Sequence, residues 1–206
     1  MIRYTRKVRS ILEFVDKYGF ITTRICGNIF FKDSKNKDTL ARRMLNKLVY
    51  NKDLISKTQS YGKELIYQRE SKQIAPHKYT LINLYSIIFN TCDEVLYFKI
   101  EENWKESKKK SDAHIIFKNN CNGKIKIKAY LIEYDKYHKT DPKKYLTIYS
   151  TEEVQEWYEE KFNKKDFFPN ILVINYNGKT DIKTNDSFKS IALDFDFNNL
   201  MQKIIL

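Results

Sequence analysis

The chain has 206 residues and a formal net charge of +12, and 42% of its residues are hydrophobic and 15% aromatic. This composition supports one or two packed domains, and only 5 glycines and 3 prolines exclude a collagen-like or low-complexity chain. No apolar run approaches the roughly 18 residues of a membrane span, so we expect a cytoplasmic protein with no membrane partner.

The positive charge is concentrated in the first third of the chain. Residues 1–72 contain 17 Lys/Arg and 7 Asp/Glu, whereas residues 73–206 contain 21 and 19. A local positive field attracts phosphate groups and releases their counterions. The charge distribution therefore favours a nucleic-acid partner for the N-terminal part.

The cysteines and histidines do not form a recognisable metal or catalytic motif. Cys26, Cys92 and Cys121 are too far apart for a paired zinc motif, and their odd number argues against a disulfide framework. The three histidines show neither HxH nor HExxH spacing. Histidine-assisted relaxase chemistry, which needs closely spaced ligands, is therefore unsupported.

The chain begins with two predicted helices. The first covers about residues 4–17 and ends at Gly19, because glycine readily takes the left-handed cap conformation. Thr22 or Thr23 is expected to cap a second, short helix. The apolar positions of the first helix follow helical spacing and are Val8, Ile11, Leu12 and Val15.

A third helix follows the polar turn 32–37, with Asp38 as its expected cap. Its expected buried stripe is Leu40, Ala41, Met44, Leu45 and Leu48. The opposite face carries donors suited to reading bases, because arginine pairs with guanine and asparagine with adenine. These donors include Arg42, Arg43 and Asn46.

Residues 54–57 and 64–67 are predicted strands joined by a turn at 60–63. Three helices and a basic hairpin predict a winged helix-turn-helix that places its third helix in the major groove. An all-helical protein-interaction module is the alternative, but the charge excess favours DNA. The expected DNA-binding residues are Lys35, Lys37, Thr39, Arg42, Arg43, Asn46, Lys47, Lys57, Tyr61 and Lys63.

A domain boundary is expected at Pro76, which gives domains 1–75 and 76–206 and an α+β chain overall. The second domain is predicted to be a mixed sheet flanked by helices, with residues 101–110 as a charged connector. The predicted helices are 77–91, one beginning after Thr151, and 198–205. The predicted strands are 95–100, 115–117, 125–135, 171–174 and 189–195.

Three carboxylates are predicted to gather at one end of this sheet. Period-two alternation places Glu133 and Asp135 on the same face as the apolar residues that precede them, and Asp112 precedes the neighbouring strand. Oxygen ligands in this arrangement suit a divalent metal. The alternatives are a solvated strand end or ion pairs with nearby lysines, namely Lys136, Lys139 or Lys143.

Several of these segments together resemble the replication-relaxation family of bacterial plasmids and integrated mobile elements. The resemblance covers about residues 5–175. It is carried by Thr39–Leu48 with its wing, by His77, by Ser111-Asp112-Ala113 and by Leu131-Ile132-Glu133-Tyr134-Asp135. It implies a winged helix followed by a domain akin to the PD-(D/E)xK nuclease fold.

The resemblance also implies roles for the carboxylates. Asp112 matches the first nuclease acid and Glu133 the second, so a nuclease would use Asp112, Glu133 and Asp135 with Mg²⁺ held by Asp112 and Glu133. Ser111 replaces the family's proline. Asp135 stands where that fold places a lysine, and an aspartate supplies no positive charge. We therefore expect a nuclease-like domain without cleavage activity and without a cofactor.

The expected function is a sequence-specific double-stranded DNA-binding accessory protein for plasmid replication or conjugative transfer. Such a relaxosome component would recruit a relaxase or a replication initiator, and a homodimer is also considered. A metal-dependent endonuclease and a transcriptional repressor of a mobile element are the alternatives.

Overall fold

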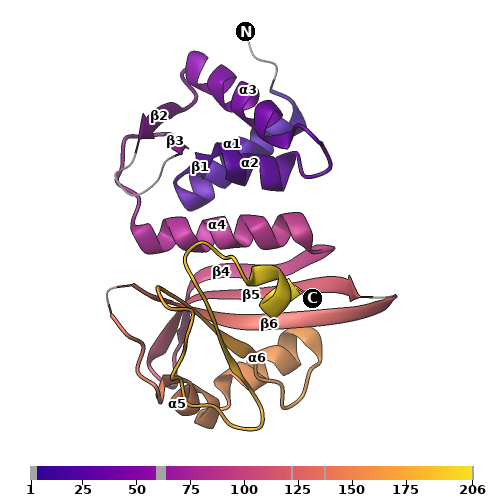
Figure 1. Cartoon of the computed structure of the whole chain (residues 1–206), viewed down its shortest axis with the longest axis vertical. Helices are drawn as coiled ribbons and strands as arrows, with labels where there is room; N and C mark the ends of the chain where they lie inside the picture. Colours follow the sequence, from indigo (N-terminus) through magenta and orange to yellow (C-terminus); the bar gives the residue numbers. More distant parts are fainter. Residues whose placement is uncertain (1–3, 59–63, 122, 137, 206) are drawn as a thin grey trace. The chain divides into compact units, whose positions relative to one another are not determined.

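Helices and two β-sheets make up the chain, which confirms the predicted α+β class (Figure 1). The computed structural model describes residues 4–58, 64–121, 123–136 and 138–205. The chain divides into two compact units, Met1–Thr91 and Cys92–Leu206. No helix in these described ranges is long and apolar enough to cross a membrane.

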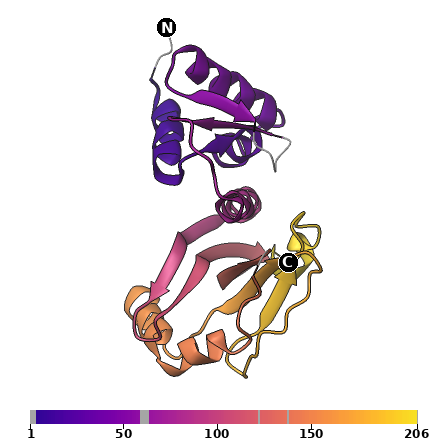
Figure 2. The same ribbon diagram turned by 90° about the vertical axis from the view of Figure 1, so that its left-hand side faces the viewer.

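The first unit combines four helices with a small antiparallel sheet whose strand order is β1-β3-β2 (Figure 2). Its elements are α1 (Arg6–Tyr18), β1 (Ile21–Thr22), α2 (Thr23–Phe30), α3 (Lys37–Tyr50), β2 (Ile55–Thr58), β3 (Leu65–Gln68) and α4 (Pro76–Thr91).

Capping residues determine where the first helices begin and end. The Thr22 hydroxyl accepts a hydrogen bond from the Ile25 N–H at the start of α2, as predicted. Gly19 ends α1 with a φ of 82°, a left-handed conformation that glycine adopts without steric cost. The predicted cap at Asp38 is wrong, because α3 begins at Lys37 after Asn36 and Asp38 lies in its first turn.

Helix α4 belongs to the first unit, so the boundary lies after Thr91 rather than at Pro76. The amide of Asn28 in α2 donates to Ser86 Oγ over 3.2 Å, and the rings of Phe20 and Tyr79 stack at 5.8 Å. Proline starts a helix here, as predicted, but this helix packs against α2 instead of opening the next unit.

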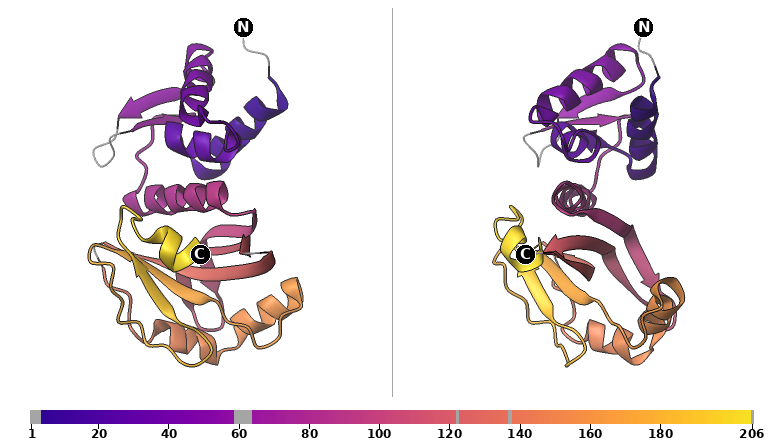
Figure 3. Two further views of the ribbon diagram at one scale, coloured as in Figure 1. Left: turned by 45° about the vertical axis from the view of Figure 1, so that its right-hand side comes forward. Right: turned by 90° about the vertical axis from the view of Figure 1, so that its right-hand side faces the viewer.

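The second unit is built on a five-stranded sheet of order β4-β5-β6-β7-β8. Strands β4, β5 and β6 are antiparallel, and β6, β7 and β8 are parallel. Helices α5 and α6 cover one face of the sheet, and the π-helix η1 lies at the other (Figure 3). The elements are β4 (Glu94–Trp104), β5 (Lys109–Cys121), β6 (Lys124–Asp135), α5 (Lys144–Ser150), α6 (Glu153–Phe162), β7 (Asn170–Asn175), β8 (Ser190–Leu193) and η1 (Met201–Ile205).

The predicted connector 101–110 is wrong, because β4 continues to Trp104 and β5 begins at Lys109. The charged residue Glu102 is buried there and accepts hydrogen bonds from the Tyr97 hydroxyl and the Lys99 ammonium, both over 2.6 Å. A charged residue ordinarily indicates a loop, but here the hydrogen bonds from Tyr97 and Lys99 satisfy the buried Glu102 carboxylate within the sheet.

Helix α5 is absent from the predicted elements, and Thr151 ends α5 rather than capping α6. The residue before α6 is Glu152, which has a left-handed φ of 59°. The last predicted helix is a short π-helix in the structure. Neither α5 nor α6 has a side-chain hydrogen bond at its N-cap, so the signal from which a helix start is predicted is missing at both.

Candidate nucleic-acid interface and carboxylate cluster

Helix α3 is amphipathic and turns one polar face to solvent. Ala41, Leu45 and Leu48 are fully buried, and Leu40 and Met44 are half-buried, so these residues form the predicted stripe against the first unit. A helical stripe of this kind fixes which side of α3 remains accessible. The predicted DNA-reading residues lie on that accessible side.

The exposed stripe of α3 extends one turn further than the sequence pattern predicted. Thr39 is half-buried, and Arg42, Arg43, Asn46 and Lys47 are exposed. Tyr50 continues the same spacing and is 86% exposed. The i+3 and i+4 spacing from Asn46 and Lys47 was the signal that would have identified it.

The positive charges on this face have no acidic partners among the residues that the structure describes. In the part of the chain that the structure describes, no carboxylate lies within 4.0 Å of Arg42, Arg43 or Lys47. By contrast, Arg69 makes an ion pair with Asp16 at 2.8 Å. The guanidinium groups of α3 are therefore available to an anionic partner, with no intramolecular ion pair to break.

A hydrogen bond from the small sheet orients the side chain of Asn46. The hydroxyl of Tyr67, a buried residue of β3, donates to Asn46 Oδ1 over 3.2 Å. This bond turns the NH₂ group of the Asn46 amide away from Tyr67, where it remains a donor. The side chain is thereby held ready for recognition of a base edge.

The other predicted DNA-binding residues differ in their surroundings. Lys35 and Lys57 are exposed, and Lys57 Nζ lies 3.4 Å from Ser71 Oγ. Lys37 points inward, where its ammonium donates to Asn28 Oδ1 over 2.7 Å and to Asn90 Oδ1 over 3.0 Å. The Lys37 ammonium therefore binds within the first unit and is not presented to DNA. The remaining two, Tyr61 and Lys63, lie outside the described residues.

In the second unit, the structure brings the three predicted carboxylates together. Ala113 pairs with Ile132, so Asp112 and Glu133 occupy the next positions along the two strands. Asp112 Oδ2 accepts the Tyr134 N–H over 2.8 Å. Asp135 follows on β6 at the end of the same strand. The two-residue periodicity of the strand therefore correctly predicts that Glu133 and Asp135 lie on one face of β6, near Asp112.

Glu133 is buried, and its carboxyl group is surrounded by hydrogen-bonding groups. Lys144 Nζ lies 2.7 Å from Glu133 Oε1, and the Tyr145 hydroxyl donates to the same oxygen over 2.5 Å. The Thr140 hydroxyl lies 2.9 Å from the other oxygen, Oε2. The lysine predicted for this role was Lys136, Lys139 or Lys143, whereas Lys144 belongs to the unpredicted helix α5.

Opposing influences act on the pKa of Glu133. Burial raises the pKa of Glu133, and the Lys144 ammonium opposes this shift only in part. The Thr140 hydroxyl also lies 2.6 Å from Asp135 Oδ1, but it has one proton and cannot donate to both carboxylates at once. The Thr140 hydroxyl proton is therefore shared between Glu133 Oε2 and Asp135 Oδ1.

The oxygens of Glu133 are not free to bind a metal in this arrangement. Both accept hydrogen bonds from protein groups, and the Lys144 ammonium lies 2.7 Å from Oε1. Among the described residues, no group of three or more His, Cys, Asp or Glu side chains is arranged to hold a metal. Glu133, which the endonuclease alternative pairs with Asp112 to hold Mg²⁺, is thus engaged by protein groups in this structure.

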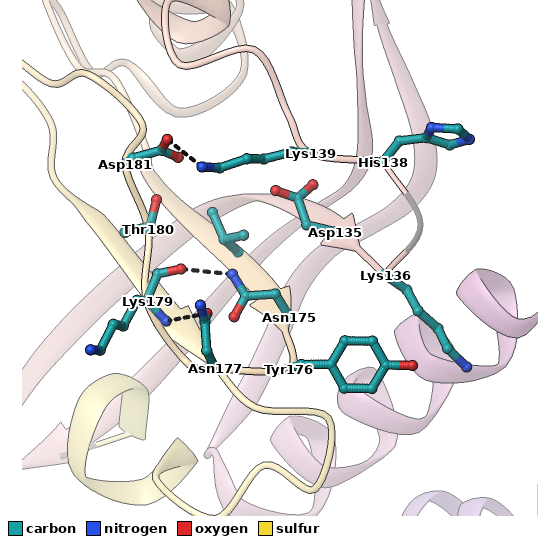
Figure 4. A pocket seen from close by; sticks show the side chains of 11 residues that line it. Asp135, Lys136, His138, Lys139, Asn175, Tyr176, Asn177, Lys179, Thr180 and Asp181 are labelled. Atoms are coloured by element: carbon teal, nitrogen blue, oxygen red, sulfur yellow. Dashed lines mark hydrogen bonds and ion pairs between the residues drawn. The ribbon is translucent and has the colours of Figure 1, made fainter.

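A cavity of about 480 Å³ lies beyond the carboxylates, at the C-terminal ends of β6 and β7 (Figure 4). The ends of parallel strands are common ligand sites. Here, however, the polar groups bind one another: Lys139 pairs with Asp181 at 2.6 Å, and the Asn175 amide donates to the Lys179 carbonyl over 2.7 Å. These contacts join the loops that form the cavity wall.

Comparison with known proteins adds no assignment to either region, because no family model, curated protein or solved structure matches the chain. The function must therefore be inferred from the residues themselves. The exposed basic face of α3 and the saturated carboxylate cluster give opposite indications: the first is open to a partner and the second is closed.

Proposed function

We propose that this chain is a sequence-specific double-stranded DNA-binding protein whose recognition element is α3. The observation that carries the proposal is the exposed stripe of α3, where Arg42, Arg43 and Lys47 lack acidic partners in the described chain. Paired hydrogen bonds from arginine to guanine, and from asparagine to adenine, are the common means of reading the major groove.

The arrangement of the first unit supports a winged helix-turn-helix. Its order α1-β1-α2-α3-β2-β3, with β3 between β1 and β2, leaves α3 as the helix that precedes the hairpin. In a winged helix the corresponding helix enters the major groove. The hairpin β2–β3 would then act as the wing, with Lys57 directed to the phosphate backbone.

We propose an accessory role for the protein in plasmid replication or in processing of a transfer origin. The second unit supports this role by its order of three antiparallel strands, helices and a parallel strand, with Asp112 and Glu133 on neighbouring strands. This order is compatible with a nuclease-like domain. Because both oxygens of Glu133 are engaged by protein groups, we assign the domain a non-catalytic role, such as recruitment of a relaxase or initiator or formation of a homodimer.

The proposal is tested by selecting duplexes from a randomised pool with the full chain and sequencing the bound fraction. We expect one recurring motif, and we expect Arg42→Ala/Arg43→Ala to lose it. Removal of two exposed lysines in the second unit, Lys183→Ala/Lys189→Ala, is the matched control and should keep the motif. A bound pool without any enriched motif would contradict sequence-specific binding.

One observation favours a second candidate, a metal-dependent endonuclease. Lys144 lies 2.7 Å from Glu133, so a positive group is present beside the acids although Asp135 replaces the lysine expected on β6. Cleavage would require Glu133 to release Lys144 and Tyr145 so that its carboxylate could bind a metal. The buried, hydrogen-bonded state of Glu133 makes this the second choice.

A further inference from the structure

The hairpin formed by β5 and β6 extends beyond the part of the sheet that the helices cover. The first residues of β6, from Lys124 to Ile127, are all exposed, and Ile125 and Ile127 are 64% and 53% exposed. The strand pairing continues through this segment, since Lys126 pairs with Asn119 and Ile125 with Asn120. The exposed segment is therefore an ordered two-stranded ribbon and not a loop.

The ribbon carries a local positive charge that the totals for the second unit conceal. Residues 117–128 contain four lysines and no Asp or Glu. Lys118 pairs with Glu94 at 3.4 Å, and Lys128 donates to the carbonyls of Ile204 and Ile205. Within the described ranges, neither Lys124 nor Lys126 has a carboxylate partner. Two ammonium groups of the ribbon are thus available.

Alternation along β6 separates the two kinds of side chain. Lys124 and Lys126 lie on one face, about 6.7 Å apart along the strand, and Ile125 and Ile127 lie on the other. The isoleucine face is the one on which Ala129 and Leu131 are buried in the core further along β6. At the end of the hairpin this apolar face continues into solvent without cover from the core.

We propose that the β5–β6 ribbon is a second contact to duplex DNA, separate from α3, and this inference rests on the proposed DNA-binding function. A two-stranded ribbon fits the major groove, which is about 12 Å wide, and apolar side chains there contact thymine methyl groups. The isoleucine face meets the floor of the groove. Lys124 and Lys126 leave the ribbon from the opposite face, and their long side chains bend around its edges to the phosphates on either side.

Charge favours this partner over a second copy of the chain. The ribbon has no acidic residue between positions 117 and 128, so a second ribbon that covers the isoleucine face offers no counter-charge to Lys124 and Lys126. Duplex DNA instead supplies a dense row of phosphates that matches the lysines. The contact would explain why an apolar pair of isoleucines lies beside unpaired lysines.

The test uses the full chain and a duplex obtained by the selection described above. Lys124→Gln/Lys126→Gln should reduce the slope of log affinity against log salt by about 1.8, the value for two phosphate contacts. Ile125→Ser/Ile127→Ser should lower affinity several-fold and leave the salt slope unchanged. The control Lys183→Gln/Lys189→Gln, which removes the same charge elsewhere, should leave the slope as in the wild type.

The outcomes separate this inference from the proposed function. If the wild type binds its duplex and the ribbon variants behave like the control, the ribbon contact is wrong and the α3 interface stands. If the wild type binds no duplex, both are overturned. If the ribbon variants instead convert a dimer to a monomer in sedimentation, with the salt slope unchanged, the ribbon is a contact between copies and the inference is wrong.

Discussion

The buried Tyr67 of β3 donates its hydroxyl proton to Oδ1 of the exposed Asn46 over 3.2 Å, and so connects the small sheet to the outer face of α3. Tyr67 is itself fixed by pairing with Ile21 and Ser56 on the two neighbouring strands. An exposed asparagine is ordinarily free to rotate. Here the sheet restricts its amide before any partner arrives, which lowers the entropy lost on binding.

Tyr67→Phe should therefore lower the affinity for the selected duplex more than the affinity for a scrambled duplex. The substitution removes one hydrogen bond, which is worth about 0.5–1.5 kcal/mol, and leaves the packing intact. We expect the ratio of specific to nonspecific affinity, measured by fluorescence anisotropy with selected and scrambled duplexes, to fall several-fold. An equal loss on both duplexes would show that Tyr67 does not act through Asn46.

The place of α4 predicts how the chain can be divided. A fragment of residues 1–91 should unfold cooperatively on heating, followed by circular dichroism. A fragment of residues 1–75 should unfold at least about 10 °C lower, because Lys37 loses Asn90 and the buried Asn28 amide loses Ser86, and a buried polar group left unpaired costs about 1–3 kcal/mol. Equal melting temperatures would mean that α4 does not belong to the first unit.

Glu133 should make the stability of the chain depend on pH. Because its pKa is raised in the folded state, the neutral form stabilises the fold fully below the unfolded pKa of about 4.3. That contribution is lost as the pH rises through the folded pKa. Glu133→Gln keeps a neutral side chain of the same shape, so it should be more stable than the wild type above this range and similar to it at lower pH.

Urea denaturation at a series of pH values measures this effect. Glu133→Ala is the informative companion variant, because it leaves the Tyr145 hydroxyl and the Lys144 ammonium without their acceptor. We expect that variant to be destabilised at every pH. If Glu133→Gln is as destabilised at neutral pH as Glu133→Ala, burial of the Glu133 charge does not limit stability there and the expected pH dependence is wrong.

The saturated cluster predicts no DNA cleavage. Supercoiled plasmid containing a selected site should remain intact with the wild type and Mg²⁺ or Mn²⁺. Nicking by the wild type that is absent from Asp112→Ala/Glu133→Ala would establish the endonuclease alternative. Asp135→Lys supplies the positive charge that the resemblance places on β6. Metal-dependent cleavage gained by that variant would show that the remaining framework is competent.

The regular spacing of apolar residues was sufficient to predict most elements of the chain. The stripe of α3 and the face of β6 that carries Glu133 and Asp135 are correct because helix and strand periodicities are local properties. The same spacing, carried one turn further, would have included Tyr50. Residues close in sequence thus define which surface each element presents.

Tertiary contacts account for what sequence spacing missed. Lysine is ordinarily a surface residue, but the ammonium of Lys37 donates to Asn28 and to Asn90, which is 53 positions away in the sequence. Lys144 pairs with Glu133 and lies on α5. Because α5 has no side-chain cap, the sequence does not mark this helix or the position of Lys144 on it. Contacts of this kind depend on how helices and strands pack together. Hydrophobic periodicity and secondary-structure propensity do not contain that information.

The central claim, that α3 reads DNA, is tested most directly by the affinity of Arg42→Ala/Arg43→Ala for a selected duplex, measured by fluorescence anisotropy at fixed salt. The matched control is Lys183→Ala/Lys189→Ala, which removes the same charge from the second unit. We predict that each arginine that makes a paired base contact contributes about 1–3 kcal/mol, so the α3 variant should bind at least tenfold more weakly while the control keeps its affinity. Unchanged affinity of the α3 variant, or an equal loss in the control, would contradict the assignment of α3 as the recognition helix.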